Sequence, residues 1–211
     1  MHIQYYGLSS FKFTTKDAVV VTDPFHKDSG LTPPRGAADI IVLAQKEKSL
    51  YSAVSGFSGE PFFVDTPGEY DIKGVTFTGV PLQQESGYTT VFLIESEDMR
   101  VLNLTHIKEW NMKEDEIEEL GEIDILILPV GGNTVLSASQ AAKVVNEIEP
   151  KIVIPSHYKA SGGSGLILDL DSVDKFIKEM GGKKEEMEKI IIKKKDLPQE
   201  GTKVVVLEPM R

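Results

Sequence analysis

Short apolar runs, each about the length of a β-strand, follow one another through the first half of the chain. They are rich in Val, Ile, Phe and Thr and are separated by turn residues such as Pro67–Gly68 and Gly74. Residues 49–57 differ, because SLYSAVSGF has the pattern of a short helix that ends near Gly56. The pattern predicts strands within 2–7, 11–15, 18–23, 38–44, 61–65, 75–80, 89–96 and 99–105.

In the second half, helical patterns alternate with continuous apolar runs. Asn111 with Glu114, and Ser137 with Gln140, have the spacing of capping boxes at the starts of helices. Helices are predicted within 112–120, 141–149 and 171–182, and strands within 123–130, 151–158, 190–196 and 203–209. Because the strands come mostly in runs, the pattern favours an α+β fold in which sheets stack on each other and helices lie outside.

Composition narrows the class of protein. The chain has 211 residues and a net charge of −10, which argues against nucleic acid or an anionic membrane as the main partner. It has no cysteine, which excludes disulfides, thiolate metal sites and a Cys nucleophile. No apolar run approaches the ~18 residues of a membrane span, and the N-terminus does not resemble a signal peptide, so we expect a cytoplasmic protein. The one charge run, residues 181–195, is typical of a solvated hairpin edge.

Candidate chemistry lies where strands end. The chain has four histidines, and two of them, His106 and His157, directly follow predicted strands. Side chains at the carboxyl ends of strands face the ligand crevice in open α/β folds. A lone histidine is more often a structural residue than a ligand, and Asp23, before Pro24, has the position of a simple turn cap. The other polar side chains at strand ends are Gln45, Glu47 and Gln84.

The order of these segments resembles the metallo-β-lactamase superfamily, in its compact branch of lactonase-like and uncharacterised zinc hydrolases. The resemblance covers nearly the whole chain. It implies a four-layer αββα sandwich in one domain, residues 1–211, with two similar halves of about 1–110 and 111–211. It rests on IQYYGLSSFKF, VVVTDPF, ADIIVLA, PGEYDIKGV, IDILILPVGG and AAKVVNEIEPKIVIPSHY.

The resemblance also implies a di-zinc site, and most of its ligands are absent here. Members carry a His-x-His-x-Asp-His loop after the ADIIV strand, whose four ligand positions fall on Gln45, Glu47, Ser49 and Leu50. A further family histidine falls near Gln84, and the bridging aspartate falls near His106. Only His157, in PSHY, matches the family ligand. Because such an ion needs three or four good donors, we expect an intact fold without the metal chemistry and no bound cofactor.

Three functions remain open at this point. The first is a non-catalytic binding or assembly protein that pairs with itself or with an active paralogue. The second is a hydrolase of phosphoesters or lactones with one zinc or other divalent ion held by Glu47, His106 and His157. The third, nucleic-acid processing as in tRNA 3′-end nucleases, conflicts with the acidic charge. Trp110, Phe57 and Tyr51 are candidate interface aromatics.

Overall fold

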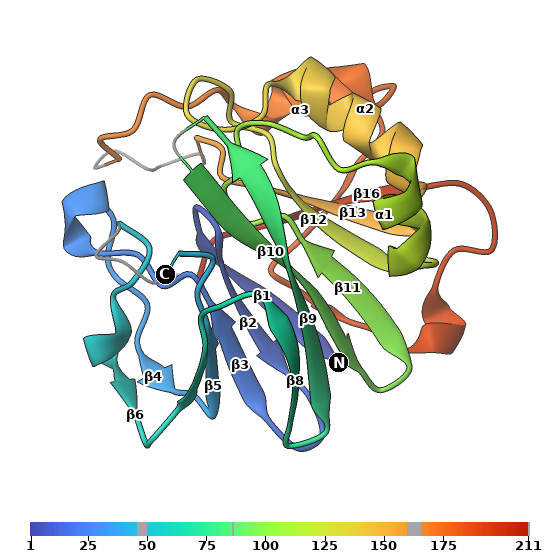
Figure 1. The fold of residues 1–211 in the computed structure, drawn as a ribbon. Coiled ribbons are helices and arrows are strands. Elements are labelled where there is room, and N and C mark those ends of the chain that lie inside the picture. Colours follow the sequence, from blue (N-terminus) through green and yellow to red (C-terminus); the bar gives the residue numbers. More distant parts are fainter. Residues whose placement is uncertain (46–49, 86, 160–165, 211) are drawn as a thin grey trace.

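Two mixed β-sheets packed face to face form the centre of the protein in a computed structural model of the chain (Figure 1). The structure describes residues 1–45, 50–85, 87–159 and 166–210. The six-stranded sheet has the order β15–β1–β2–β3–β5–β7. Its strands are β15 (Lys189–Ile191), β1 (His2–Gly7), β2 (Ser10–Thr14), β3 (Val19–Thr22), β5 (Ile40–Val42) and β7 (Phe62–Val64).

The larger sheet has eight strands in the order β14–β16–β13–β12–β11–β10–β9–β8. Strands β8 to β11 are antiparallel, and β11 to β13, β16 and β14 run parallel to one another. Its strands are β14 (Glu185–Met187), β16 (Lys203–Leu207), β13 (Ile152–Ser156), β12 (Ile125–Pro129), β11 (Met99–Asn103), β10 (Gly87–Ser96), β9 (Val75–Gln84) and β8 (Gly68–Ile72).

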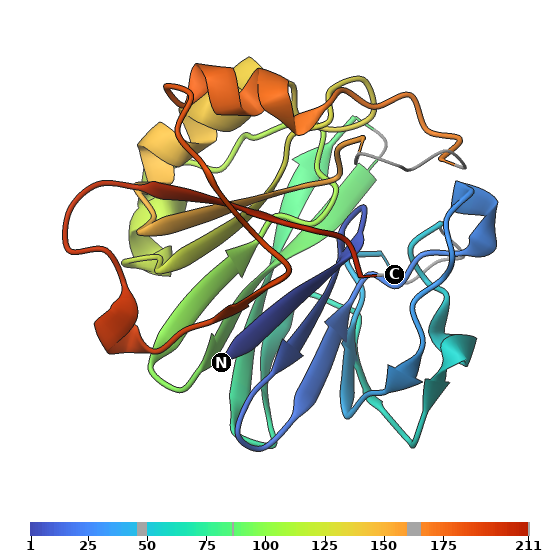
Figure 2. The same ribbon diagram turned by 180° about the vertical axis from the view of Figure 1, so that it is seen from behind.

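The outer layers differ between the two sheets. Helices α1 (Glu114–Leu120), α2 (Ala138–Ile148) and α3 (Val173–Glu179) lie outside the eight-stranded sheet (Figures 1 and 2). Outside the six-stranded sheet lie the 3₁₀ turns η1 (Lys27–Ser29) and η2 (Val54–Gly56) and a small sheet of β4 (Gly36–Ala37) and β6 (Phe57–Ser58). The predicted sandwich of two mixed sheets with helices outside is therefore confirmed, and the layer over the smaller sheet is built from short elements.

Alternation of buried and exposed residues explains most of these strands. In β1 and β2 the residues that face the other sheet are fully buried aromatics, including Tyr5, Phe11 and Phe13. Strands β12 and β13 are buried at every position, as expected for parallel strands covered on both faces. The prediction of continuous apolar runs as buried strands is confirmed for both.

Two helix predictions need correction. A helix was expected over 49–57, but the described part of this segment is the 3₁₀ turn η2 followed by β6. The backbone packs closely here, since a Cβ atom added at Gly56 would lie 2.9 Å from the Pro34 carbonyl oxygen. Helix α1 begins at Glu114 and not after Asn111, because the Glu116 carboxylate accepts the Lys113 N–H at 2.8 Å. The capping box of Ser137 and Gln140 at the start of α2 is confirmed.

The sheets exchange strands between the two parts of the chain. Strand β15 comes from the C-terminal part and pairs with β1 in the smaller sheet, whereas β8 to β11 come from the first half and lie in the larger sheet. The boundary near residue 110 therefore does not coincide with a boundary between sheets. No helix in the described part of the chain is long and apolar enough to cross a membrane.

One glycine allows the segments that follow β12 and β13, neighbouring strands of the larger sheet, to lie close together. Gly131 follows β12, and a Cβ atom at this position would lie 2.0 Å from the His157 carbonyl oxygen. Real Cβ atoms do not approach that closely, so the backbone after β12 or after β13 would have to move. The Gly131–Gly132 turn is thus required for packing as well as for turning the chain.

We predict that Gly131→Ala lowers the free energy of unfolding by about 3 kcal/mol or more, because the added methyl group meets backbone. Gly181→Ala is the matched control, since its Cβ has no neighbour within 4 Å and it carries only the strain of φ 83°. That strain costs about 1 kcal/mol. Urea unfolding of both variants measures the difference, and equal losses would contradict the prediction.

Candidate functional site

Five strands end at one edge of the sandwich and bring several of the polar residues predicted from the sequence together. Strand β3 runs parallel to β5, and β11, β12 and β13 run parallel to one another, so their carboxyl ends lie at the same edge. Asp23 follows β3, His106 lies just after β11, and His157 follows β13. The side chain of Tyr51 packs against both histidine rings.

Asp23 is a buried carboxyl group with one partner. Its Oδ1 accepts the Ala44 N–H at 2.8 Å, whereas Oδ2 has no hydrogen-bond partner. The side chain is 1% exposed, and burial raises its pKa to about 7, although the Ala44 hydrogen bond acts in the opposite direction. Asp23 is therefore more than the turn cap that the sequence indicated, because it can hold a proton near neutral pH.

His106 faces Asp23 across a gap. Its Nδ1 lies 4.0 Å from Asp23 Oδ2, which is beyond hydrogen-bond distance, and neither ring nitrogen has a hydrogen-bond partner. The Tyr51 ring stacks on the imidazole with ring centroids 4.3 Å apart and 25° between the planes. Burial lowers the pKa of His106 to about 4, so the imidazole is neutral at physiological pH.

His157 is buried at the contact between the two sheets. Its backbone N–H donates to the Leu8 carbonyl at 2.8 Å and to the Tyr5 hydroxyl at 3.1 Å. Its Nε2 lies 3.2 Å from the Tyr51 hydroxyl, and Nδ1 has no partner. Burial, and to a smaller extent the nearby His106, lower its pKa to about 3. This histidine therefore has both the structural role that is common for a lone histidine and a ring that faces the site.

The other predicted site residues have different roles or lie outside the described residues. Gln45 donates from Nε2 to the Thr89 hydroxyl at 3.2 Å, and Leu50 is held through its backbone carbonyl, which accepts the His26 N–H at 2.8 Å. Gln84 is buried, and its side-chain amide forms hydrogen bonds with four backbone groups, which belong to residues 83, 108 and 109. Glu47 and Ser49 lie outside the residues that the structure describes.

Tyr51 is the residue of the site that sequence reasoning missed. The sequence suggested an exposed interface aromatic, but the ring is half-buried between the two histidines. Burial, with Asp23 as a smaller cause, raises its pKa, so the phenol keeps its proton. Its place one residue after the four loop positions was the only available signal, since neither spacing nor composition predicts a stacking contact across 55 residues of sequence.

Unpaired polar atoms and unusual backbone angles concentrate at this edge. Ten buried side-chain nitrogen and oxygen atoms of the described residues have no hydrogen-bond partner, and nine of them belong to residues 9–10, 23, 103–106 and 156–157. Four non-glycine residues beside them have left-handed φ angles: Leu8, Asp23, Thr105 and His157. Such strain and such unpaired groups are typical of functional sites.

The described residues supply few adjacent donors for a metal ion. Among the described residues, no three His, Asp or Glu side chains are arranged so that they could hold a metal ion. Asp23 and His106 supply two adjacent donors, but the Tyr51 ring lies against both His106 and His157. Zinc sites need three or four N, O or S donors at about 2.0–2.3 Å. The described part of the site is thus a cluster of buried polar side chains against which the Tyr51 ring packs.

Solved structures define the class of fold. A Thermotoga maritima protein of the metallo-β-lactamase superfamily matches with a TM-score of 0.81 and 28% identity, covering 98% of this chain and 97% of that one. Igni18, a metallo hydrolase from Ignicoccus hospitalis, matches in fold with a TM-score of 0.68 and 15% identity, covering 100% and 96% of the two chains. The arrangement of two mixed sheets is therefore that of the metallo-β-lactamase fold.

The sequence itself assigns the family. The family described as "Beta-lactamase superfamily domain" matches residues 2–157, and the chain belongs to this superfamily. A UPF0173 metal-dependent hydrolase of Lysinibacillus sphaericus is 25% identical over 199 aligned residues, covering 75% of this chain and 85% of that protein. The UPF0173 metal-dependent hydrolase YtkL of Bacillus subtilis is 24% identical, with coverage of 75% and 86%.

We predict that Asp23 makes stability depend on pH. Its pKa is about 7 in the folded state and 3.8 when the group is exposed to solvent, so folding penalises the charged form and stability falls as pH rises from about 4 to 7. Asp23→Asn removes this penalty. The variant should therefore gain stability relative to wild type between pH 5 and pH 8, by on the order of 2–3 kcal/mol.

The measurement is urea unfolding of both proteins in EDTA across that range. His106→Gln is the matched control, because the pH dependence of stability that it removes has the opposite direction. The pKa of His106 is lowered from 6.5 to about 4, so wild type should lose stability relative to this variant as pH falls below 6.5. A difference between wild type and Asp23→Asn that does not change with pH would show that the carboxyl titrates normally.

Proposed function

We propose that this chain is a metallo-β-lactamase-fold protein that acts by binding or assembly, without two-metal hydrolysis. The observation that supports the proposal is the position of Tyr51, whose ring packs against His157, which matches a family ligand, and against His106, which lies near the family's bridging aspartate position. With Tyr51 stacked at 4.3 Å on His106, an ion between the two histidines would have to displace the ring.

Charge supports the same proposal. Ionised carboxylates offset part of the charge of two divalent cations, because unpaired buried charge is costly in either sign. The described pocket holds one carboxyl group with a raised pKa and two neutral imidazoles. Uncharged side chains can be buried without a metal ion to balance their charge. Gln45, Leu50 and Gln84, which stand at three family ligand positions, are all uncharged.

We predict that the purified protein holds well under one equivalent of zinc, manganese or iron, and that calorimetric titration with zinc shows no stoichiometric tight binding. Elemental analysis by mass spectrometry, with carbonic anhydrase as a zinc standard, measures the content. Tyr51→Phe is a useful companion variant, since it keeps the stacking ring and removes only the hydroxyl near His157. One tightly bound ion per chain would refute the proposal.

A second candidate is a hydrolase with a reduced one-metal site. Two findings favour it: the relatives are named metal-dependent hydrolases, and Asp23 Oδ2 and His106 Nδ1 face each other at 4.0 Å without other partners. His157 Nδ1 is also unpaired. The site expected from the sequence, Glu47 with His106 and His157, would hold one zinc or other divalent ion that activates water for phosphoester or lactone hydrolysis.

For this candidate, His106→Ala and His157→Ala should each abolish metal binding and turnover of a nitrophenyl phosphodiester or a lactone together. Gln84→Ala is the control, because its amide bonds only backbone groups and should change stability without removing a metal donor. Turnover that survives in both histidine variants would reject the one-metal hydrolase and leave contamination as the source of activity.

A further inference from the structure

The two sheets have four outer strands, and one of them, β7, differs in chemistry from the others at its free edge. Strand β7 pairs with β5 and with no other strand of the described residues. Phe62 is 50% exposed and Phe63 is 41% exposed, although they point to opposite faces of the sheet. Exposed aromatic side chains on both faces of an outer strand are typical of an interaction surface.

The backbone of β7 presents one residue to a partner. The Phe62 N–H donates to the Asp39 carbonyl and the Val64 carbonyl accepts the Leu43 N–H, each at 2.9 Å, so both residues bond toward β5. In a parallel ladder the residue between them bonds to the opposite side. The N–H and C=O of Phe63 therefore point away from the sheet. Pro61 has no N–H, so it limits a new ladder to the three residues of β7.

We propose that β7 pairs antiparallel with β7 of a second copy of this chain, with Phe63 at the two-fold axis. Phe63 would exchange both of its backbone hydrogen bonds with Phe63 of the copy, and Phe62 would lie opposite Val64. The two Phe63 rings would then form a cross-strand aromatic pair on one face. The two six-stranded sheets would become one continuous sheet through the dimer.

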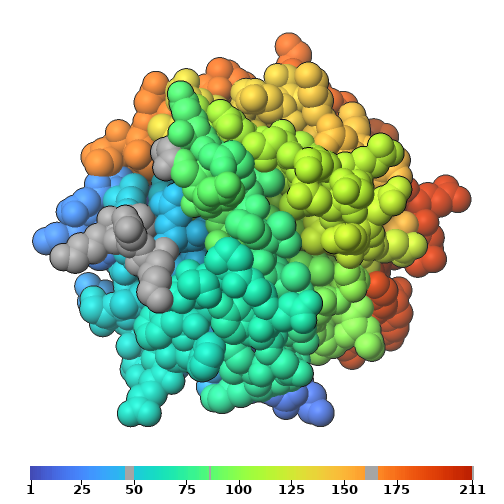
Figure 3. All heavy atoms as spheres, in the orientation of Figure 1, coloured from blue at the N-terminus to red at the C-terminus, as the bar shows by residue number. Residues whose placement is uncertain are grey.

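The register at this edge places no like charges directly opposite each other. In the paired register Glu60 would lie opposite Thr66 and Pro61 opposite Asp65, so no like charges face each other directly. Phe62 also contacts Tyr70 of β8, with ring centroids 6.5 Å apart, which extends the aromatic surface to the edge of the other sheet. The segments around residues 57–72, cyan to teal in Figure 3, lie at the lower left of that face.

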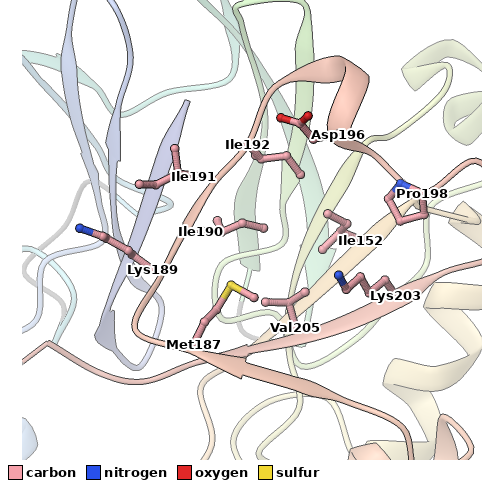
Figure 4. A pocket seen from close by; sticks show the side chains of 10 residues that line it. All are labelled: Ile152, Met187, Lys189, Ile190, Ile191, Ile192, Asp196, Pro198, Lys203 and Val205. Carbon is pink, nitrogen blue, oxygen red and sulfur yellow. The ribbon is translucent and has the colours of Figure 1, made fainter.

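Strand β15, at the opposite edge of the same sheet, carries charges that disfavour pairing with a second copy. Strand β15 bonds β1 through Ile192, so Ile191, which is 58% exposed, faces outward in the same way as Phe63. Self-pairing about Ile191 would place Lys189 opposite Lys193, and like charges directly opposite are unfavourable. Beside β15 lies a groove of about 400 Å³ lined by apolar side chains with Lys189 and Lys203 (Figure 4).

The proposal goes beyond the proposed function, because it does not depend on whether a metal binds. The first test is the molar mass by sedimentation equilibrium. Wild type should rise from 23.3 kDa toward twice that mass as concentration increases. Phe63→Lys should remain a monomer, because two lysines would meet at the two-fold axis. Ile191→Lys, the matched control on β15, should behave as wild type, and circular dichroism checks that all three are folded.

Salt adds a second signature. Each copy carries a net charge of −10, so added salt screens the repulsion between copies and should increase the dimer fraction. A monomer at every concentration and salt, a dimer that Phe63→Lys leaves intact, or dissociation by Ile191→Lys would each overturn the proposal. So would a dimer that dissociates when salt is added, since that indicates pairing of opposite charges.

The register is tested by disulfide formation, because the natural chain has no cysteine. Directly opposite residues in a hydrogen-bonded antiparallel pair have Cα atoms about 5.5 Å apart, within the range that a disulfide spans. Phe63→Cys should therefore form a covalent dimer rapidly on mild oxidation, and Ile191→Cys should do so only slowly. Equal rates for the two variants would overturn the register even if a dimer forms.

Discussion

The contact between the end of β13 and the turn after β1 holds the candidate site together. The His157 N–H is shared between the Leu8 carbonyl and the Tyr5 hydroxyl, and these bonds join the larger sheet to the smaller one at the edge where the strands end. Gly131 lies against the His157 carbonyl and permits no side chain there. Leu8 and His157 both have left-handed φ angles, so the junction stores local strain. The surrounding sheets must supply the energy that keeps it in place.

The fold could be predicted largely from the sequence because its information is local. Continuous apolar runs such as 123–130 and 151–158 are buried strands, and the capping box at Ser137 begins a helix as expected. The errors arose where a tertiary contact competes with a local pattern. Residues 50–57 have helical composition, but the neighbouring Pro34–Arg35 backbone and the pairing of β6 with β4 leave only a 3₁₀ turn.

The site was predictable only in part. Parallel strands that end at one edge explain why Asp23, His106 and His157 come together, and that follows from the strand order. No periodicity predicts that Tyr51 stacks on His106, or that Gln84 bonds backbone around residues 108–109, because both depend on exact placement of side chains from distant segments. The family resemblance pointed to the positions to compare, whereas the structure shows the contacts that the described residues make at those positions.

The backbone at the edge where the site lies is fixed by the core of the sandwich. The strained residues Leu8, Asp23, Thr105 and His157 are fixed by the ends of buried strands, and altering them would disturb the core on both sides. Side chains that project into the pocket carry no such constraint once charge is balanced. The described side chains here include a half-buried phenol ring, two neutral imidazoles and the Asp23 carboxyl, whose pKa burial raises to about 7. Packing of the core therefore fixes the backbone of such a site whatever side chains it carries, which makes an intact fold weak support for any particular chemistry.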